Sequence, residues 1–242
     1  MSEDFTLARY SEILILAKKK FRFATFSQRH EEGHVALWRH DIDFSPQRAL
    51  ALARAEADAG VVATYFVQLS SRFYNAFEPE ITGVIRQVVK LGHEIGLHFE
   101  TEAAGSGDDG DHERRLAFQA GVLEHIAEKK VAAFSLHNPT TMGGISFDEP
   151  EHCGLLNASH SALRQDFTYC SDSNGVWRFR SLSAVVSDTQ VKRLYVLTHP
   201  EWWQEVAMAP RERIQRCIDG RADCSARYYD GLLSANDRPN VR

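Results

Sequence analysis

Residues 35–45 read VALWRHDIDFS, and this segment guides the interpretation of the whole chain. Its apolar first half is typical of a buried strand, and Asp41 and Asp43 lie where that strand ends. Side chains two residues apart on an extended chain point the same way, so we expect the two carboxylates side by side. Such a pair repels unless a cation or a shared proton relieves it. The segment therefore indicates a metal site.

Three further strand candidates run directly into a histidine. They are residues 94–97 before His98, residues 132–136 before His137, and residues 194–198 before His199. In a parallel α/β fold the carboxyl ends of the strands share one face, where active sites are built. Two imidazoles and one carboxylate, with a water in the open position, form a recurring catalytic zinc set. An aspartate left unligated beside such a set would act as a base.

Strand and helix patterns alternate along the 242 residues. Ser45 and Pro46 are typical of a helix start, and Gly60 of its end. Further helices are predicted over residues 81–91, 112–130 and 210–218, and a buried strand over residues 61–69. With no linker evident, the pattern predicts one α/β domain over residues 1–242 with a core at about 35–203. Its sheet or barrel is expected to be mainly parallel.

Composition and charge exclude several classes of protein. The formal net charge is -5 and the pI about 6.1, which argues against a nucleic-acid partner. No apolar run reaches the roughly 20 residues that span a bilayer. Acidic residues come first, and the short apolar stretch 13–17 precedes the basic residues 18–20, the reverse of a signal peptide. We therefore expect a cytoplasmic protein.

Each of these polar residues also has a structural interpretation. The chain has eleven histidines, and a single histidine is usually a surface residue or a hydrogen-bonded core residue. Asp41 and Asp43 could form a solvated turn before Ser45. The coincidence of the aspartate pair with three histidines at strand ends favours the metal site.

Several blocks resemble the polysaccharide deacetylase family, the NodB-homology group also known as carbohydrate esterase family 4. The blocks are RHDIDFS (39–45), ATYFV (63–67) and GHEIGLH (92–98), followed by the weaker SLHNP (135–139), SDS (171–173) with WR (177–178), and LTHP (197–200). They cover residues from about 35 to 203 and fit a divergent branch. The resemblance implies an α/β fold, a distorted (β/α) barrel of about seven parallel strands, with a zinc-type site at its carboxyl rim.

The resemblance also implies roles for the aspartates and histidines. Asp41 matches the general base, and Asp43 matches a metal ligand. The family's second motif supplies two histidines four residues apart; His98 matches the first, but Glu102 stands in the second place. We propose His137 as the replacement for the missing imidazole, with Glu102 as the alternative ligand.

The remaining roles concern proton transfer and the substrate. His199 matches the histidine that protonates the leaving amine, and Arg178 resembles the arginine that orients the base. The implied reaction removes an acetyl or formyl group from an amino sugar or related amide, with a divalent metal, most simply Zn²⁺. The preferred setting is surface-polysaccharide or lipopolysaccharide assembly on a small-molecule or glycan-precursor substrate. The alternatives are a ring-opening or other C–N amidohydrolase, and an inactive barrel used for binding.

Overall fold

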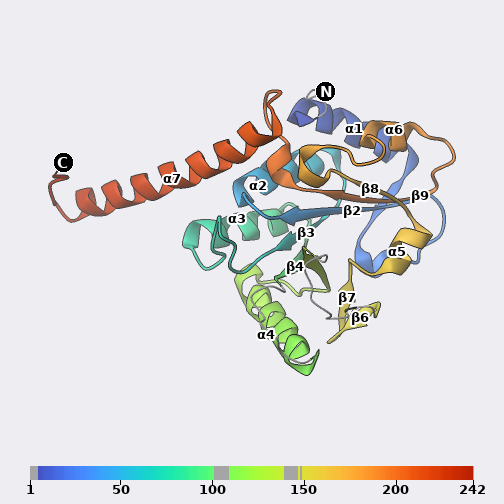
Figure 1. The fold of residues 1–242 in the computed structure, drawn as a ribbon, viewed down its shortest axis with the longest axis horizontal. Helices are drawn as coiled ribbons and strands as arrows, with labels where there is room; N and C mark the ends of the chain where they lie inside the picture. The colour runs from blue at the N-terminus through green and yellow to red at the C-terminus, as the bar shows by residue number, and fades with distance from the viewer. Residues whose placement is uncertain (1–4, 101–108, 139–146, 148, 242) are drawn as a thin grey trace.

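The computed structural model describes residues 5–100, 109–138, 147 and 149–241 (Figure 1). The helices are α1 (Leu7–Lys20), η2 (Phe26–Gln28), α2 (Pro46–Ala59), α3 (Pro79–Lys90), α4 (Asp109–Ala127), α5 (Ser161–Asp166), η5 (Ser173–Gly175), α6 (Leu182–Ser187), η6 (Pro200–Trp202) and α7 (Pro210–Ala235). The strands are β1 (Arg22–Ala24), β2 (Val35–Ile42), β3 (Thr64–Val67), β4 (Glu94–Glu100), β5 (Ala133–His137), β6 (Glu151–His152), β7 (Leu155–Asn157), β8 (Thr168–Ser171) and β9 (Arg193–Thr198).

The strands form one curled sheet in the order β6-β7-β5-β4-β3-β2-β9-β8, with β1 paired to β2. Every pairing is parallel except that of β6 with β7. The predicted set of about seven parallel strands is confirmed in the run from β7 to β8. Among the described residues no pairing joins β8 to β6 or β7, so the sheet is a half-barrel rather than a closed ring.

Helices cover the outer face of the sheet. In Figure 1, α1, α2 and α3 lie along one side of the strands, and the contacts run from α6 through α1, α2 and α3 to α4. The larger apolar core lies between these helices and the sheet. Ser45 caps α2 by accepting from the Arg48 backbone N–H, and Gly60 ends the helix with φ +65°, a conformation that glycine adopts without strain.

The alternation of β2 separates two environments. Trp38 and Ile42 belong to the outer core beneath the helices, whereas Val35 and Leu37 belong to a smaller core inside the curl. Tyr195, on the neighbouring β9, lies in this inner core too. The next inward positions of β2 are Arg39 and Asp41. Polar groups therefore lie on the inner core, at the carboxyl end of the sheet, where we expected the site.

The last helix differs most from expectation. The sequence pattern predicted a helix over residues 210–218, but α7 continues to Ala235 and projects from the body (Figure 1). A two-point ion pair between Arg221 and Glu78 ties its middle to the start of α3. Within the described residues, none of the helices combines the length and apolar character that a bilayer crossing requires.

Candidate functional site

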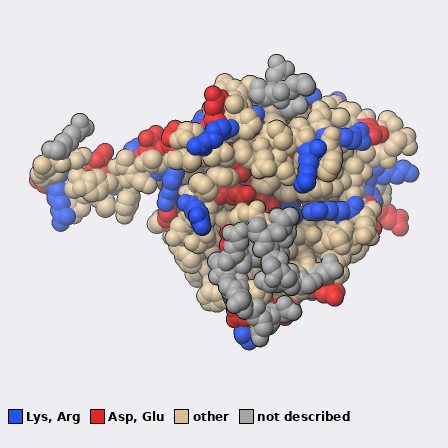
Figure 2. Space-filling view, in the orientation of Figure 1, with Lys and Arg blue, Asp and Glu red and all other residues tan. Residues whose placement is uncertain are grey.

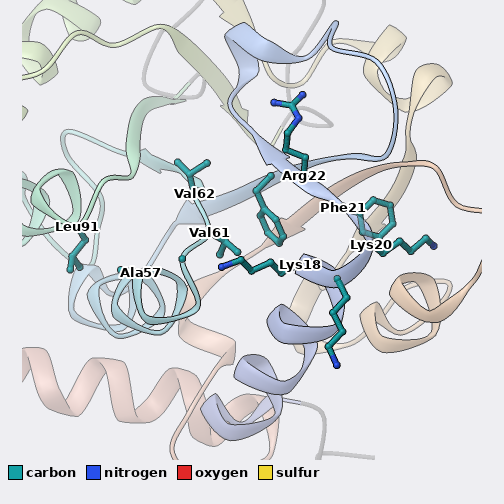
Figure 3. A pocket seen from close by; sticks show the side chains of 11 residues that line it. Lys18, Lys20, Phe21, Arg22, Ala57, Val61, Val62 and Leu91 are labelled. Atoms are coloured by element: carbon teal, nitrogen blue, oxygen red, sulfur yellow. The ribbon is translucent and has the colours of Figure 1, made fainter.

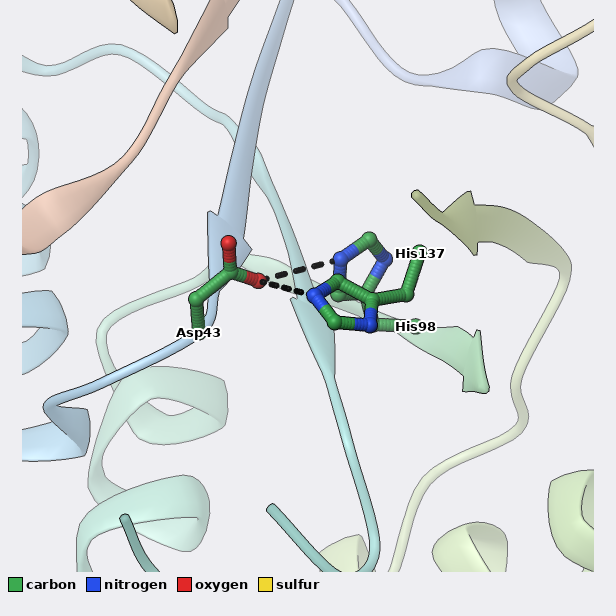
Figure 4. Close-up of side chains that lie close together, drawn as sticks. All are labelled: Asp43, His98 and His137. Atoms are coloured by element: carbon green, nitrogen blue, oxygen red, sulfur yellow. Dashed lines mark ion pairs between the residues drawn. The ribbon is translucent and has the colours of Figure 1, made fainter. Parts of the chain in front are cut away.

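Asp43, His98 and His137 come from three elements and meet at one point (Figure 4). His98 lies in β4 and His137 ends β5, while Asp43 follows β2. The Oδ1 atom of Asp43 lies 3.1 Å from Nε2 of His98 and 4.0 Å from Nε2 of His137. One ligand atom from each residue lies within 4.8 Å of the others. The structure thus brings together the three residues that the sequence analysis assigned to the metal.

Each imidazole is held from behind by a side chain on the adjacent strand. His98 Nδ1 lies 2.7 Å from the Ser135 hydroxyl, and His137 Nδ1 lies 3.0 Å from Oε2 of Glu100. Both pairs are directly opposite each other in the parallel register of β4 and β5. A histidine that binds a metal almost always uses its other ring nitrogen in this way, which fixes the tautomer and the ring orientation.

The donor set fits a divalent cation. Oδ1 of Asp43 is buried and faces the two imidazole nitrogens without a hydrogen bond of regular geometry in the described structure, so a cation between the three groups would compensate its burial. Two imidazole nitrogens and one carboxylate oxygen with an open side are a donor set that catalytic zinc favours. Glu102, the alternative ligand, lies outside the described residues.

Asp41 lies on the same face as Asp43 but is bound by an arginine. The buried guanidinium of Arg39 donates from Nε to Oδ1 at 2.7 Å and from Nη2 to Oδ2 at 2.5 Å. Burial raises the pKa of Asp41, but the charges of Arg39 and His98 outweigh it and hold that pKa below its usual range. His98 Nε2 lies 3.8 Å from Asp41 Oδ2, so the carboxylate sits at the edge of the metal ligand set.

The arginine beside the base is not the one expected. Arg178 is exposed, and no hydrogen bond or ion pair between it and Asp41 is found in the described structure. Arg39 makes those contacts because it lies two residues before Asp41 and therefore on the same side of β2. Its Nη1 also donates to the Tyr195 hydroxyl and to the Ala158 carbonyl, which holds the guanidinium in place.

His199 follows β9 and is paired with a buried carboxylate. Its Nδ1 lies 2.7 Å from Oδ1 of Asp172, and its backbone N–H also donates to that carboxylate. Burial lowers the pKa of His199, but the charge and the hydrogen bond of Asp172 outweigh it and raise the pKa well above the ordinary value. This pairing favours the protonated imidazole.

The site residues line a single cavity of about 630 Å³. This volume is typical of small-molecule sites. The lining includes all the predicted site residues, which are Asp41, Asp43, His98, His137, Arg178 and His199. A second cavity of about 730 Å³ lies where the strands begin, between residues 18–23 and the segments before β3 and β4 (Figure 3). Its lining contains no histidine or carboxylate, so it lacks a comparable donor set.

The sequence analysis assigned no role to three residues that contact the predicted site residues. Arg39 and Asp172 lie in quoted blocks, and Glu100 lies in none of them. The signal for Arg39 was available in the two-residue spacing. Glu100 and Asp172 act on histidines from neighbouring strands, so only the register reveals them.

A separate buried network lies on the opposite side of β2. His40 contacts Glu56 of α2 at 2.6 Å and the Thr198 hydroxyl at 2.8 Å. The hydroxyl groups of Tyr10 and Tyr65 also donate to the Glu56 carboxylate. These groups are buried beneath the helices and do not line the 630 Å³ cavity. The network locks α2 to β2 and β9, the strands that lead into Asp41, Asp43 and His199.

Comparison with known proteins identifies the fold. No family model matches the chain, and no curated protein matches it. Among solved structures, a carbohydrate esterase family 4 pseudoenzyme from Bacillus anthracis aligns with a TM-score of 0.50 at 14% identity. The chain has the NodB-homology fold. The alignment covers 79% of this chain and 63% of that one, so this chain spans less than two thirds of that structure's length.

Two other solved structures are similar at lower scores. One is the chitin deacetylase from the fungal pathogen Colletotrichum lindemuthianum, with TM-score 0.47, 13% identity and coverage of 78% of this chain and 83% of that one. The other is the carbohydrate esterase family 4 domain of a multidomain xylanase from the hindgut metagenome of Trinervitermes trinervoides, with TM-score 0.44, 13% identity and coverage of 87% and 95%. The expected NodB-homology fold is confirmed by the alignment with the Bacillus anthracis structure.

Proposed function

We propose that this protein is a metal-dependent hydrolase that removes an acetyl or formyl group from the nitrogen of an amino sugar or a related amide. One observation carries the proposal. A donor set suited to a divalent cation, an aspartate bound by Arg39 and a histidine paired with Asp172 line the same cavity. Amide hydrolysis needs an activated water and a proton for the departing nitrogen, and these groups supply both.

Each side chain has a distinct role in this proposal. Asp43, His98 and His137 would hold the cation, most simply Zn²⁺, which polarises an amide carbonyl and lowers the pKa of water. Asp41, ionised and oriented by Arg39, would accept the proton of the attacking water. His199, charged beside Asp172, would give its proton to the nitrogen as the C–N bond breaks. The products would be a free amine and acetate or formate.

The proposal favours catalysis over a purely binding role. The similar Bacillus anthracis protein is described as a pseudoenzyme, so the fold alone does not imply activity. In this chain, however, Asp43, His98 and His137 each bring one ligand atom to a common position, and Oδ1 of Asp43 is buried there. Such a convergence of donors suits a metal site better than a mere scaffold.

We further propose that the chain acts as one catalytic domain in surface-polysaccharide or lipopolysaccharide assembly. The domain proposal is supported by pairing between the two ends of the fold. The Leu7 N–H donates to the Gln204 carbonyl at 2.8 Å, and the Gln204 N–H donates to the Phe5 carbonyl at 3.0 Å. The biological setting rests on fold analogy.

The test is an assay of both products on purified protein loaded with zinc. N-acetylated and N-formylated amino sugars are incubated with the protein, and free amine and released carboxylic acid are measured together. Equal yields of the two, abolished by a chelator and by Asp41→Asn, support the proposal. New amine or acid groups without acetate or formate, on a cyclic amide, indicate ring opening instead. A protein that retains no stoichiometric metal and cleaves none of these amides is an inactive barrel.

A further inference from the structure

Two arginines at the cavity form no ion pair with any carboxylate of the described residues. Arg164 lies in α5 and Arg178 follows η5, and both line the 630 Å³ cavity. The Arg164 guanidinium lies 4.8 Å from the centre of the Tyr169 ring, and that of Arg178 lies 5.8 Å from the Phe179 ring. In the part of the chain that the structure describes, neither guanidinium forms an ion pair. Stacking on an aromatic ring positions a guanidinium and leaves its N–H groups free to bind a ligand.

The other charges of the cavity are accounted for within the site. Arg39 is paired with Asp41, and His199 is paired with Asp172. The carboxylate of Asp43 faces the two metal-binding imidazoles, and a divalent cation there would add positive charge. Figure 2 shows acidic side chains in the middle of the visible face, with Lys and Arg side chains on both sides of them. The loaded cavity would therefore attract anions.

We propose that the natural substrate carries an anionic group, a phosphate or a carboxylate, and that Arg164 and Arg178 bind it while the acylated nitrogen faces the metal site. This inference rests on the proposed function of the same cavity and specifies its substrate class. Guanidinium groups match phosphate and carboxylate geometry with paired N–H donors. The hydroxyls of Ser171 and Ser173 line the same cavity and add neutral donors. Phe179, with 81% of its surface exposed, offers a face on which a sugar ring could stack.

The experiment measures binding by calorimetry to the zinc-loaded full chain. The probes are N-acetylglucosamine, N-acetylglucosamine 6-phosphate and N-acetylneuraminic acid, which are neutral, phosphorylated and carboxylated respectively. The variants are Arg164→Gln/Arg178→Gln, the charge-preserving Arg164→Lys/Arg178→Lys, and Arg180→Gln. Arg180 is a matched control because it is close in sequence but pairs with Asp188 and does not line the cavity.

We expect at least one anionic probe to bind about tenfold or more tightly than the neutral sugar, which is the scale of charge-assisted hydrogen bonds. The double glutamine variant should lose that preference, the double lysine variant should retain part of it, and Arg180→Gln should retain all of it. Because an anion can also coordinate zinc, the loss in the glutamine variant is the decisive result. The better of the two anionic probes identifies phosphate or carboxylate as the recognised group.

The inference is overturned if no anionic probe binds more tightly than the neutral sugar, including the case in which none binds, or if the preference survives in the double glutamine variant. A parallel assay of acyl release separates this inference from the proposed function. Release with equal kcat/KM from anionic and neutral amides, in the wild type and in the glutamine variant alike, refutes the anionic substrate and leaves the hydrolase standing. Arginine-dependent anion binding without acyl release from any amide supports the anion site and refutes the hydrolase.

Discussion

Arg39 holds Asp41 through two parallel hydrogen bonds, from Nε to Oδ1 at 2.7 Å and from Nη2 to Oδ2 at 2.5 Å, inside the protein. Without this partner, the buried charge of Asp41 would strongly destabilise the folded protein. With it, Asp41 is ionised and fixed in orientation. The same contacts lower its pKa, so Asp41 accepts a proton less readily than a free carboxylate, and precise placement has to compensate.

Replacing Arg39 by lysine should shift the pH dependence of the reaction. Lysine keeps the charge but cannot make both hydrogen bonds, so the pKa of Asp41 should rise toward its ordinary value. Asp41 must be ionised to accept a proton. Because its pKa is lowered in the native state, its ion pair also stabilises the fold until the pH falls through that lowered value. The acid limb of kcat/KM should therefore move to higher pH, and stability should be lost at a higher pH on acidification. The fold should be weakened by about 1–3 kcal/mol at neutral pH, measured by denaturant unfolding. An unchanged acid limb in a folded variant would show that Asp41 is not the base.

Substitutions in the aspartate pair should separate metal binding from catalysis. Asp43→Ala and His98→Ala each remove a ligand, so the purified proteins should contain only traces of metal by elemental analysis. Asp41→Asn removes the base and leaves the ligands, so its metal content should match the wild type while kcat falls by about 10²–10⁴-fold. Wild-type turnover in Asp41→Asn, or full metal content in Asp43→Ala, contradicts the assignment of the two aspartates.

The carboxylate behind His137 should strengthen metal binding without touching the metal. Glu100→Gln keeps an oxygen that can accept from His137 Nδ1 but removes the charge, so zinc affinity should fall by about 10–100-fold in competition with a chelator. Glu113→Gln is the matched control, because Glu113 contacts His152 at 3.1 Å in the same way but outside the cluster. Equal affinities in the two variants would remove Glu100 from the site.

The pair formed by Asp172 and His199 should set the alkaline limit of activity. In the proposed reaction His199 must be protonated, and Asp172 raises its pKa, so activity is lost as the pH rises through that raised value. Asp172→Asn removes the charge, so the pKa of His199 should fall and the basic limb of kcat should move to lower pH. The stabilising effect of the pair is present below the ordinary histidine pKa and disappears as the pH rises through the raised one.

Asp188→Asn serves as the control for that experiment. Asp188 pairs with Arg180 at the surface, away from the cavity. Its replacement should leave both limbs of the pH profile in place. If Asp172→Asn behaves like Asp188→Asn, the proton on His199 has no part in the rate-limiting step.

The part of the site that the sequence predicted best lies at the ends of the strands. Alternation along β2 and the carboxyl-end rule for parallel sheets predicted that the aspartate pair and the strand-end histidines would lie at one rim. The family resemblance then singled out Asp43 and His98, with His137 as the proposed third ligand, and the structure brings these three together. What the sequence did not reveal depends on register. Glu100 lies opposite His137, and Ser135 lies opposite His98, only because β4 and β5 pair with one particular offset. Arg178 was assigned to the base because a loose local match cannot show which guanidinium the fold brings close.

The length of α7 was missed for a different physical reason. Its second half packs little on the body, and its apolar residues Tyr228, Tyr229 and Leu232 are exposed, so burial in the core does not mark this half as part of the helix. Two glycines at 220 and 231 add to the impression of a break. The ion pair of Arg221 with Glu78 is a tertiary contact that no local pattern announces.

The strict alternation along β2 makes this strand unusually sensitive to insertion or deletion. Removing one residue ahead of Asp41 would turn its carboxylate toward the helices and the Glu56 network, and would bring the neighbouring imidazole of His40 into the cavity. Catalytic groups and the buried anchoring network would be lost in a single event, since they occupy opposite sides of one ribbon. A point substitution changes a side chain on one face of β2, whereas a change in spacing exchanges the side chains of the cavity face and the helix-covered face.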